Sequence, residues 1–587
     1  MKLIDHYIRL WSTFYKTDGE PVKLTREDAA NTLGCSERNA VHVLNNLEEE
    51  GWMKRTKGRG RGNVTRATFL LGLTDAVDIY AARSAGHEDF KRFAELAEEC
   101  GLLEQNEEVM ERFFSNWFGA ALENESETAE TDHLHIPYFR TFFSLDPKVA
   151  ARQSERHMIV HIFNTLFYWD ERSRRVVPGI AHHIEADAEG REWMIYLRKH
   201  VCFHHGKTLS AEDVIFSLRR IAWLEPFLAS AEAEEELTVK VKLTEPLFAF
   251  PVLLTSTSGA VVPDQLGGLS GSAFARTPIG TGPFMVKNHD EEHLELASHR
   301  RYFRERPHLE GVTIHFLQSY EKYIRMRKVG DQPLPYLPFH TGAGGVDRVR
   351  HAMRRGLSVK YLVWNMNHQS IRENKPFRKK VMALINREQL VDDLGYPRDR
   401  GAGSFFKNSR MADKLEVPQA NVTQPDGKLI LVTYDLKPHV EDAKWIAAAC
   451  MDQGIDVEVR AVAYDMFSEE AAIGHLILAE SPSDEAEEAM LWGLFTSNQL
   501  TGNLDQQTVI SIAVRLSDAA SRPELPERIG RLGRIEDLLI TQGLVLPLYW
   551  TYQQAAFSSE LMGVRLNAFG LVPFDELFFK KATGILV

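Results

Sequence analysis

The chain has 587 residues, of which 44% are hydrophobic and 26% are charged, and its formal net charge is −13. These are the proportions of a soluble globular protein, and the length predicts two to four domains. No stretch reaches the roughly eighteen uncharged apolar residues of a membrane span, and the four cysteines are too scattered for a disulfide framework. We see no signal peptide at the start of the sequence, so a cytoplasmic protein with reduced thiols is expected.

The first part of the chain predicts a helix-turn-helix. Residues 4–15 have the apolar spacing of a helix. Thr25, followed three residues later by Asp28, is typical of a capped helix start, and Gly34 can take the left-handed conformation that ends a short helix. Ser36 then caps a second helix. Two short helices joined by a tight glycine turn indicate a helix-turn-helix.

A basic ribbon follows these helices. Residues 53–69 resemble a two-stranded ribbon, and the segment 51–74 contains six Lys or Arg residues and no acid. Residues 1–70 carry twelve Lys/Arg against nine Asp/Glu, although the chain as a whole is acidic. Such a wing suits the phosphates and minor groove of a duplex, and the alternative is a helical hairpin with a solvated basic loop. The side chains expected to contact double-stranded DNA are Ser36, Arg38, Asn39, His42, Asn45 and Asn46 of the second helix and Lys57, Arg59, Arg61, Asn63 and Arg66 of the wing.

We therefore expect a winged helix-turn-helix domain of α(+β) type over residues 1–75 and a helical connector over residues 76–132. A polar stretch at residues 124–128 reads as a linker. The connector is either a homodimer contact, as two-fold operators favour, or a spacer packed on its own chain.

From residue 133 to residue 587 short apolar strands alternate with helices, which predicts a large α/β domain. Within it, Ser210 is expected to cap a helix that follows a strand and a tight turn. Gly280 and Gly282, flanked by prolines, predict a reversal of the chain in a closely packed place.

Four passages in this region, in this order, resemble the family 5 extracellular solute-binding proteins of ABC transporters. The resemblance covers roughly residues 135–585 and rests on residues 162–168 with 178–181, residues 193–218, residues 278–284, and residues 376–387. It implies a periplasmic-binding-protein type II-like domain of two lobes, and we expect the chain to cross between the lobes near residues 280–300 and 490–505.

The combination with a winged helix resembles the SgrR group, bacterial transcription regulators that join a DNA-binding domain to a solute-binding domain. This second resemblance is carried by Leu33-Gly34-Cys35-Ser36, Gly51-Trp52, Gly60-Arg61-Gly62, Ile136-Pro137-Tyr138 and residues 152–157. It implies a ligand-responsive regulator.

The expected ligand is a small solute held between the lobes: a sugar, a sugar phosphate or a short peptide. Aromatic and amide side chains at the end of a predicted strand, and two acids in the region where peptide receptors carry an acid, are the candidate ligand contacts. These residues are Tyr361, Trp364, Asn365, Asn367, Glu480 and Asp484. The alternative for Trp364 and the asparagines is a place in the core and in turns.

The sequence predicts no catalytic site, no metal site and no cofactor. The pairs His182-His183 and His204-His205 point to opposite faces if they lie in strands, so neither pair can easily share one ion. Two other functions remain as alternatives: an ABC-transporter-associated binding protein without direct DNA binding, and an enzyme on a solute-binding scaffold. The leading hypothesis is the transcription regulator, with no membrane partner.

Overall fold

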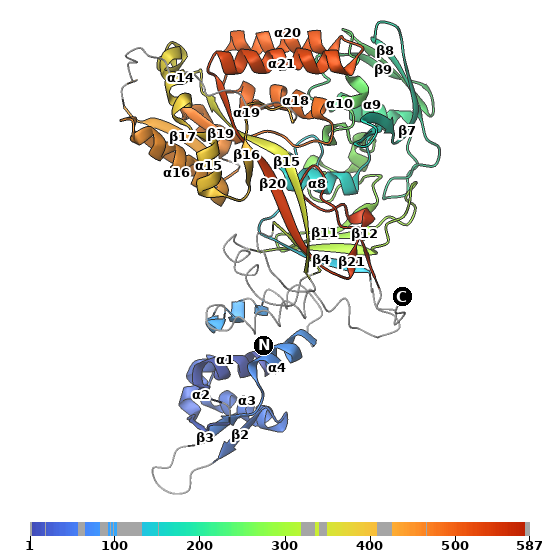
Figure 1. Cartoon of the computed structure of the whole chain (residues 1–587). Helices are drawn as coiled ribbons and strands as arrows, with labels where there is room; N and C mark the ends of the chain where they lie inside the picture. Colours follow the sequence, from blue (N-terminus) through green and yellow to red (C-terminus); the bar gives the residue numbers. More distant parts are fainter. Residues whose placement is uncertain are drawn as a thin grey trace, which may run out of the picture.

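The structure is a computed structural model that describes residues 3–17, 19–56, 65–82, 92–93, 95–97, 99–102, 132–150, 152–317, 335–339, 349–407, 425, 427–464 and 466–580. In Figure 1 a small N-terminal domain lies at one end of a much larger domain. Among the helices of these residues, none combines the length and the apolar character needed to cross a bilayer.

The N-terminal domain is a winged helix-turn-helix. Its elements are α1 (Leu3–Phe14), β1 (Val22–Lys23), α2 (Arg26–Leu33), α3 (Glu37–Glu49), β2 (Met53–Thr56), β3 (Arg66–Phe69) and α4 (Leu73–Ala82). The strands form an antiparallel sheet in the order β1-β3-β2. The predicted caps are confirmed: the backbone N of Asp28 donates to Thr25 Oγ1 at 3.0 Å, the backbone N of Thr25 donates to Asp28 Oδ2 at 3.0 Å, and Gly34 has φ +62°.

Helix α4 belongs to this domain, which therefore continues past residue 75. Ala76, Val77 and Tyr80 are fully buried in the same hydrophobic cluster as Tyr7 and Ile8 of α1. The expected connector from residue 76 thus begins as part of the winged helix-turn-helix domain. Much of its remainder, including the predicted linker at 124–128, lies outside the described residues.

The first half of the large domain holds two antiparallel-rich sheets. Its elements are β4 (His133–Tyr138), α8 (Gln153–Ile162), β5 (Phe167–Asp170), β6 (Arg175–Pro178), β7 (Ala181–Ala186), β8 (Glu192–Leu197), α9 (Ala211–Arg219), β9 (Leu228–Glu235), β10 (Thr238–Leu243), α10 (Phe250–Leu253), α11 (Gly271–Arg276), β11 (Phe284–His289), β12 (His293–Ser298) and β13 (Gly311–Phe316). One sheet has the order β7-β8-β10-β9 and the other the order β11-β12-β13-β4, in which β13 and β4 are parallel.

The second half is built on a mixed sheet in the order β14-β20-β15-β19-β17-β18, with β16 paired to β20. Its strands are β14 (Tyr336–Pro338), β15 (Val349–Trp364), β16 (Arg398–Gly401), β17 (Leu429–Tyr434), β18 (Val457–Val462), β19 (Leu476–Glu480) and β20 (Val545–Ser558), and a short pair β21 (Leu561–Met562) and β22 (Phe578–Phe579) follows. Its helices are α13 (Gln369–Arg372), α14 (Lys375–Leu384), α15 (Arg387–Leu394), α16 (Lys437–Met451), α17 (Phe467–Ile473), α18 (Glu487–Thr496), α19 (Asn498–Thr501), α20 (Gln506–Ala520) and α21 (Leu525–Thr541). Strands β17, β18 and β19 are parallel neighbours, as the alternation of strands and helices predicted.

The two long strands β15 and β20 run between the two parts of the large domain (Figure 1). They pair in antiparallel register from Val349 opposite Ser558 to Val363 opposite Val545. The crossings expected near residues 280–300 and 490–505 are wrong, because those segments form the hairpin β11–β12 and the helices α18 and α19. The long strands β15 and β20 are less visible in the sequence, since their pairing joins residues that are 182 to 209 positions apart.

The helix cap predicted at Ser210 is present. The Asp213 carboxylate accepts hydrogen bonds from the backbone N of Ser210 at 2.9 Å and from Lys207 Nζ at 2.6 Å. The predicted order of a strand, a tight turn and a helix that begins after Ser210 is therefore confirmed.

The glycine turn is also tightly packed, as predicted. The backbone N of Gly282 donates to the carbonyl oxygen of Ile162 at 2.9 Å, and a Cβ built on Gly280 would lie 1.9 Å from the same oxygen. The end of α8 therefore packs directly against the backbone of this turn.

We expect the substitution Gly280→Ala to lower the free energy of unfolding by about 3 kcal/mol, the upper end of the usual cost of overpacking, because the obstructing atom belongs to the backbone. The measurement is chemical denaturation of the whole chain. The matched control is Gly530→Ala in α21, where a Cβ meets no atom within 4 Å, and which should stabilise the helix by about 0.5–1 kcal/mol. Equal unfolding midpoints for both variants would contradict the packing argument.

Candidate functional site

Helix α3 presents a polar surface to solvent. Its buried side is formed by Ala40, Val43, Leu44 and Leu47, and the side chain of Ser36 caps its start by accepting from the backbone N of Asn39 at 3.4 Å. The opposite side carries the residues predicted to contact DNA: Ser36, Arg38, Asn39, His42 and Asn45 are exposed, and Asn46 is half-buried. The structure thus gathers the helix part of the predicted DNA-binding set on one face.

The wing is tied to this helix by a residue that the sequence analysis did not single out. Arg55 of β2 donates from Nε to Glu48 Oε2 at 2.9 Å and from a terminal nitrogen to Asn45 Oδ1 at 2.5 Å. The side-chain oxygen of Asn45 is therefore already engaged within the domain. In the sequence, the role of Arg55 is indicated only by the basic character of the ribbon, and composition does not reveal which way a side chain points.

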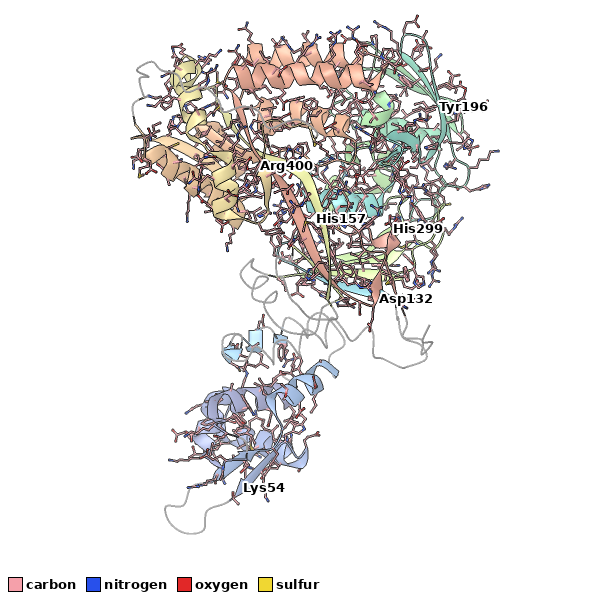
Figure 2. The ribbon with its side chains drawn as sticks, viewed as in Figure 1. Lys54, Asp132, His157, Tyr196, His299 and Arg400 are labelled. Carbon is pink, nitrogen blue, oxygen red and sulfur yellow. The ribbon has the colours of Figure 1, made fainter. Side chains whose placement is uncertain are left out.

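The described part of the wing is exposed and basic. Arg66 on β3 is exposed, and Lys54 on β2 lies at the end of the N-terminal domain away from the large domain (Figure 2). The predicted contacts Lys57, Arg59, Arg61 and Asn63 lie outside the described residues.

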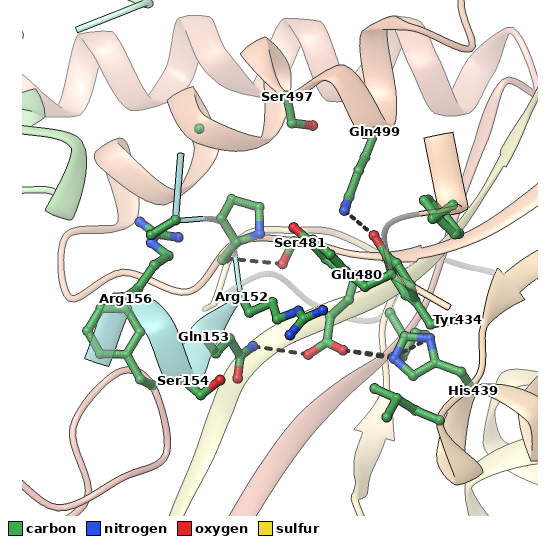
Figure 3. Close-up of a pocket in the computed structure, with 18 of the residues that line it drawn as sticks. Arg152, Gln153, Ser154, Arg156, Tyr434, His439, Glu480, Ser481, Ser497 and Gln499 are labelled. Carbon is green, nitrogen blue, oxygen red and sulfur yellow. Dashed lines mark hydrogen bonds and ion pairs between the residues drawn. The ribbon is translucent and has the colours of Figure 1, made fainter. Parts of the chain in front are cut away.

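A cavity of about 1060 Å³ lies between the two parts of the large domain (Figure 3). One side comes from residues 138–156 around the start of α8, with Thr257 and Phe569. The other side comes from β17, α16, α17, the end of β19 and the turn around residues 497–503. This cleft is the candidate solute site.

The cleft includes only some of the residues predicted from sequence. Asn367 and Glu480 line it, whereas Tyr361 and Trp364 are fully buried in the core of the large sheet. Asn365 is also fully buried, and its Nδ2 donates to the carbonyl oxygens of three residues between 471 and 474. For Trp364 and Asn365 the structure therefore agrees with the alternative interpretation, a place in the core and in turns.

Glu480 lies at the centre of a buried polar cluster. It accepts hydrogen bonds from Lys360 Nζ at 2.8 Å, from Gln153 Nε2 at 3.2 Å and from the hydroxyl of Ser358, and His439 Nε2 is 3.6 Å away (Figure 3). Burial alone would raise the pKa of Glu480, but Lys360 and His439 outweigh burial and hold the pKa well below its usual range. Burial, with Lys360, lowers the pKa of His439 to about 4, so the histidine stays neutral at pH 7.

Asp484 lies behind the lining rather than in it. It is 6% exposed, and its Oδ2 is 3.5 Å from a terminal nitrogen of Arg156, which does line the cleft and also donates from Nε to Thr257 Oγ1 at 2.9 Å. Burial raises the pKa of Asp484, and Arg156 opposes that rise. Asp484 therefore positions an arginine.

Aromatic side chains supply much of the remaining wall. Tyr434 stacks on Phe467 with ring centroids 4.0 Å apart and on Tyr464 at 5.5 Å, and the Arg152 guanidinium lies 4.2 Å from the centroid of Tyr464. All four line the cleft. No sequence motif predicts that these four residues line the cleft, because only the folding of the sheet brings them together.

Within the described residues, no group of three or more His, Cys, Asp or Glu side chains is placed to hold a metal ion. His204 is buried, which lowers its pKa to about 3, and its Nδ1 accepts from the backbone N of Gly280 at 3.2 Å. His182 and His183 of β7 are both exposed. The two histidine pairs are therefore structural or solvent-exposed.

Comparison with known families identifies the large domain. Residues 175–514, more than half of the chain, match the bacterial extracellular solute-binding proteins, family 5 Middle. The chain belongs to this family. Residues 2–112 match the N-terminal region described as "Sugar transport-related sRNA regulator N-term", so the solute-binding domain follows a regulator domain.

Relatives share both parts. The YhjP protein of Bacillus subtilis is 26% identical over 605 residues, which cover 99% of this chain and 100% of YhjP. The HTH-type transcriptional regulator SgrR of Yersinia enterocolitica is 24% identical over 591 residues, 98% of each chain. The SgrR regulator of Escherichia coli O6:K15:H31 is 29% identical over 316 residues, 53% of this chain and 54% of that regulator.

Solved structures agree on the fold of the solute-binding domain. A dipeptide-binding protein from Pseudoalteromonas in complex with Met-Leu has a TM-score of 0.65 at 14% identity, and covers 76% of this chain and 100% of its own. The oligopeptide-binding protein AppA from Bacillus subtilis, in complex with a nonapeptide, has a TM-score of 0.63 at 18% identity over 76% of this chain and 99% of its own. These likenesses confirm the bilobal α/β fold expected from the sequence.

The cleft ion pair yields a test of stability. We expect Lys360→Met to lower the free energy of unfolding by about 1–3 kcal/mol at pH 7, because it leaves the half-buried Glu480 carboxylate without its cation. Adding Glu480→Gln to Lys360→Met should recover part of that loss. Denaturation of the wild type, both single variants and the double variant forms a complete cycle, and strictly additive effects would contradict the pairing.

The same pair fixes the sign of a pH effect. Because the folded pKa of Glu480 is depressed, its contribution to stability is present above the ordinary glutamate pKa of about 4.3 and is lost as the pH falls below it. The stability difference between wild type and Glu480→Gln should therefore shrink on acidification, which denaturation at pH 7 and at pH 3.5 measures. A difference that grows at the lower pH would contradict this assignment.

Proposed function

We propose that this protein is a DNA-binding transcription regulator whose affinity for its operator responds to a small solute held in the cleft of the solute-binding domain. The observation that carries the proposal is the joining of a winged helix-turn-helix with an exposed polar α3 to a solute-binding domain with a large internal cleft. The similarity of nearly the whole chain to an HTH-type regulator supports it.

On the DNA side, Arg38, Asn39 and His42 would face the major groove. All three are exposed on the same face of α3, and arginine and asparagine make the bidentate contacts that distinguish bases. Arg66 and the wing residues Lys57, Arg59, Arg61 and Asn63 would contact phosphates or the minor groove. Binding to a two-fold operator would use a homodimer, and the protein would act in the cytoplasm.

On the solute side, the cleft has the size and the wall of a small-molecule site. A volume of about 1060 Å³ is just above the range of roughly 300–1,000 Å³ for ligand pockets. Stacked aromatic rings and hydrogen-bonding side chains such as Gln153, Asn367 and Gln499 suit a sugar, a sugar phosphate or a short peptide.

A route from the solute to the DNA-binding domain runs through two phenylalanines. Phe139 and Phe339 line the cleft, their ring centroids are 5.9 Å apart, and both pack against the hydrophobic cluster of the N-terminal domain. Leu337 on β14 and Ala556 on β20 belong to that same cluster. A solute that changes the packing of these rings would therefore shift the placement of the winged helix, and coupling of this kind is reciprocal.

The alternative function is an ABC-transporter-associated binding protein without direct DNA binding. The likeness to solved peptide-binding proteins favours it for the large domain alone. It leaves the exposed polar face of α3 and the basic wing without a role, so we prefer the regulator. Catalysis has no support from any side-chain arrangement in the described part of the cleft.

The DNA-binding surface is tested by alanine substitutions, measured with duplex fragments that the wild-type protein selects from genomic DNA. Arg38→Ala should weaken binding by about 1–3 kcal/mol through loss of a base contact. Arg66→Ala, and Arg59→Ala with Arg61→Ala, should flatten the dependence of log K on log salt by about 0.9 for each lost phosphate contact. The control is Lys16→Ala, an exposed lysine in the loop after α1. Unchanged affinity and slope in every wing and α3 variant would reject the proposal.

The coupling is tested with the solutes that raise the melting temperature of the protein in a panel of sugars, sugar phosphates and peptides. Such a solute should change the affinity for DNA, and DNA should change the affinity for the solute by the same factor, typically about 5- to 150-fold. Phe339→Leu should reduce that factor, and Phe303→Leu, outside the cleft lining, is the control. A factor unchanged in Phe339→Leu would rule out this route.

A further inference from the structure

The charge inside the cleft is opposite to that of the chain. Six Lys or Arg residues line the cleft but only two acids do, although the whole chain has a net charge of −13. The cations are Arg140, Lys148, Arg152, Arg156, Lys360 and Lys437, and the acids are Asp435 and Glu480. A concave site with such an excess concentrates anions.

Most of the nearby acids are already engaged with particular cations. Glu480 is bound by Lys360, and Asp484 pairs with Arg156 from behind the lining. Glu155 approaches Arg152 only to 3.7 Å, and one of its carboxylate oxygens accepts from the backbone N of Phe143 at 2.6 Å. Even when Glu155 and Asp484 are counted with the lining, cations outnumber acids.

Arg140 and Arg152 are the two guanidinium groups whose charge is least compensated. Each has a buried Nε with no hydrogen-bond partner among the described residues. Arg140 stands over the ring of Phe139, with 5.1 Å from its guanidinium carbon to the ring centroid. Both guanidinium groups line the same cleft, and burial, followed by the like charge of Arg140, lowers the pKa of Arg152.

The start of α8 adds a further polar group at the same place. Ser154 in the first turn of α8 lines the cleft, is 3% exposed, and its Oγ has no hydrogen-bond partner among the described residues. Buried hydroxyl groups are nearly always hydrogen-bonded, so an unpaired one at the wall of a cavity indicates a missing acceptor or donor.

We propose that the solute carries an anionic oxygen group, a carboxylate or a phosphate, which binds between Arg140 and Arg152 at the start of α8. The inference rests on the proposed function, in that the cleft is the solute site, and adds the chemical class of the solute. Guanidinium groups suit such oxygens because they donate two parallel hydrogen bonds. A cationic group is disfavoured, because Glu480, the less exposed of the two acids that line the cleft, is already neutralised by Lys360.

The experiment follows the melting temperature of the whole chain in sodium phosphate, sodium acetate and sodium chloride at one ionic strength and pH 7.5. Phosphate, acetate or both should raise the melting temperature of the wild type above its value in chloride by about 3 °C or more. A response to phosphate alone identifies a phosphate site, and a response to acetate identifies a carboxylate site.

Because phosphate and acetate also stabilise proteins by exclusion from their surface, the decisive readout is the comparison of variants. Arg140→Gln with Arg152→Gln should lose the extra rise. Arg300→Gln with Arg301→Gln removes the same charge from two exposed positions outside the cleft lining and should keep it. If the double cleft variant does not melt cooperatively, Arg140→Gln alone replaces it. Within the described residues Arg140 makes no hydrogen bond or ion pair, so its substitution should not disturb folding. This single variant should lose at least half of the rise in melting temperature.

An equal rise in the wild type and in the cleft variants would overturn the proposal, as would a wild type that responds no more to phosphate or acetate than to chloride. The measurement contains no DNA. The absence of an anion response would therefore not contradict the regulator proposal. Likewise, the absence of DNA binding would not contradict the anion site.

Discussion

The antiparallel pairing of β15 with β20 is the constraint on which the rest of the large domain depends. It runs from Val349 opposite Ser558 to Val363 opposite Val545, and β15 also pairs with β19. The pairing of β15 with β19 places Lys360 opposite Glu480, and the far end of β20 brings Ala556 into the hydrophobic cluster of the N-terminal domain. One pair of strands thus connects the cleft chemistry with the DNA-binding domain.

The parts of the fold that depend on neighbours in sequence could be predicted. The Thr25–Asp28 capping box, the left-handed Gly34 and the Ser210–Asp213 cap use hydrogen bonds across three residues or the special conformation of one. The polar face of α3 followed from helical spacing alone. The tight packing at Gly280 followed from glycine and proline chemistry.

The cleft could not be predicted in the same way. Residues 357–366 form a continuous buried run, which is typical of a strand covered on both faces, so Tyr361 and Trp364 are core side chains although they look like ligand contacts in the sequence. The residues that do face the cavity, such as Arg152 and Glu480, are more than three hundred positions apart and meet only through the sheet topology. Asn367 was predicted from its place at a strand end, and Glu480 from the position of an acid in the peptide receptors that the sequence resembles.

The contacts of Arg55 have a consequence for how this domain approaches a duplex. Since Arg55 holds β2 to Glu48 and Asn45 of α3, the strand that leads into the wing and the helix proposed to face the major groove are one preorganised surface before any DNA is present. Little conformational entropy of these two elements is then lost on docking, so the contacts made to the duplex are reflected more fully in the observed affinity.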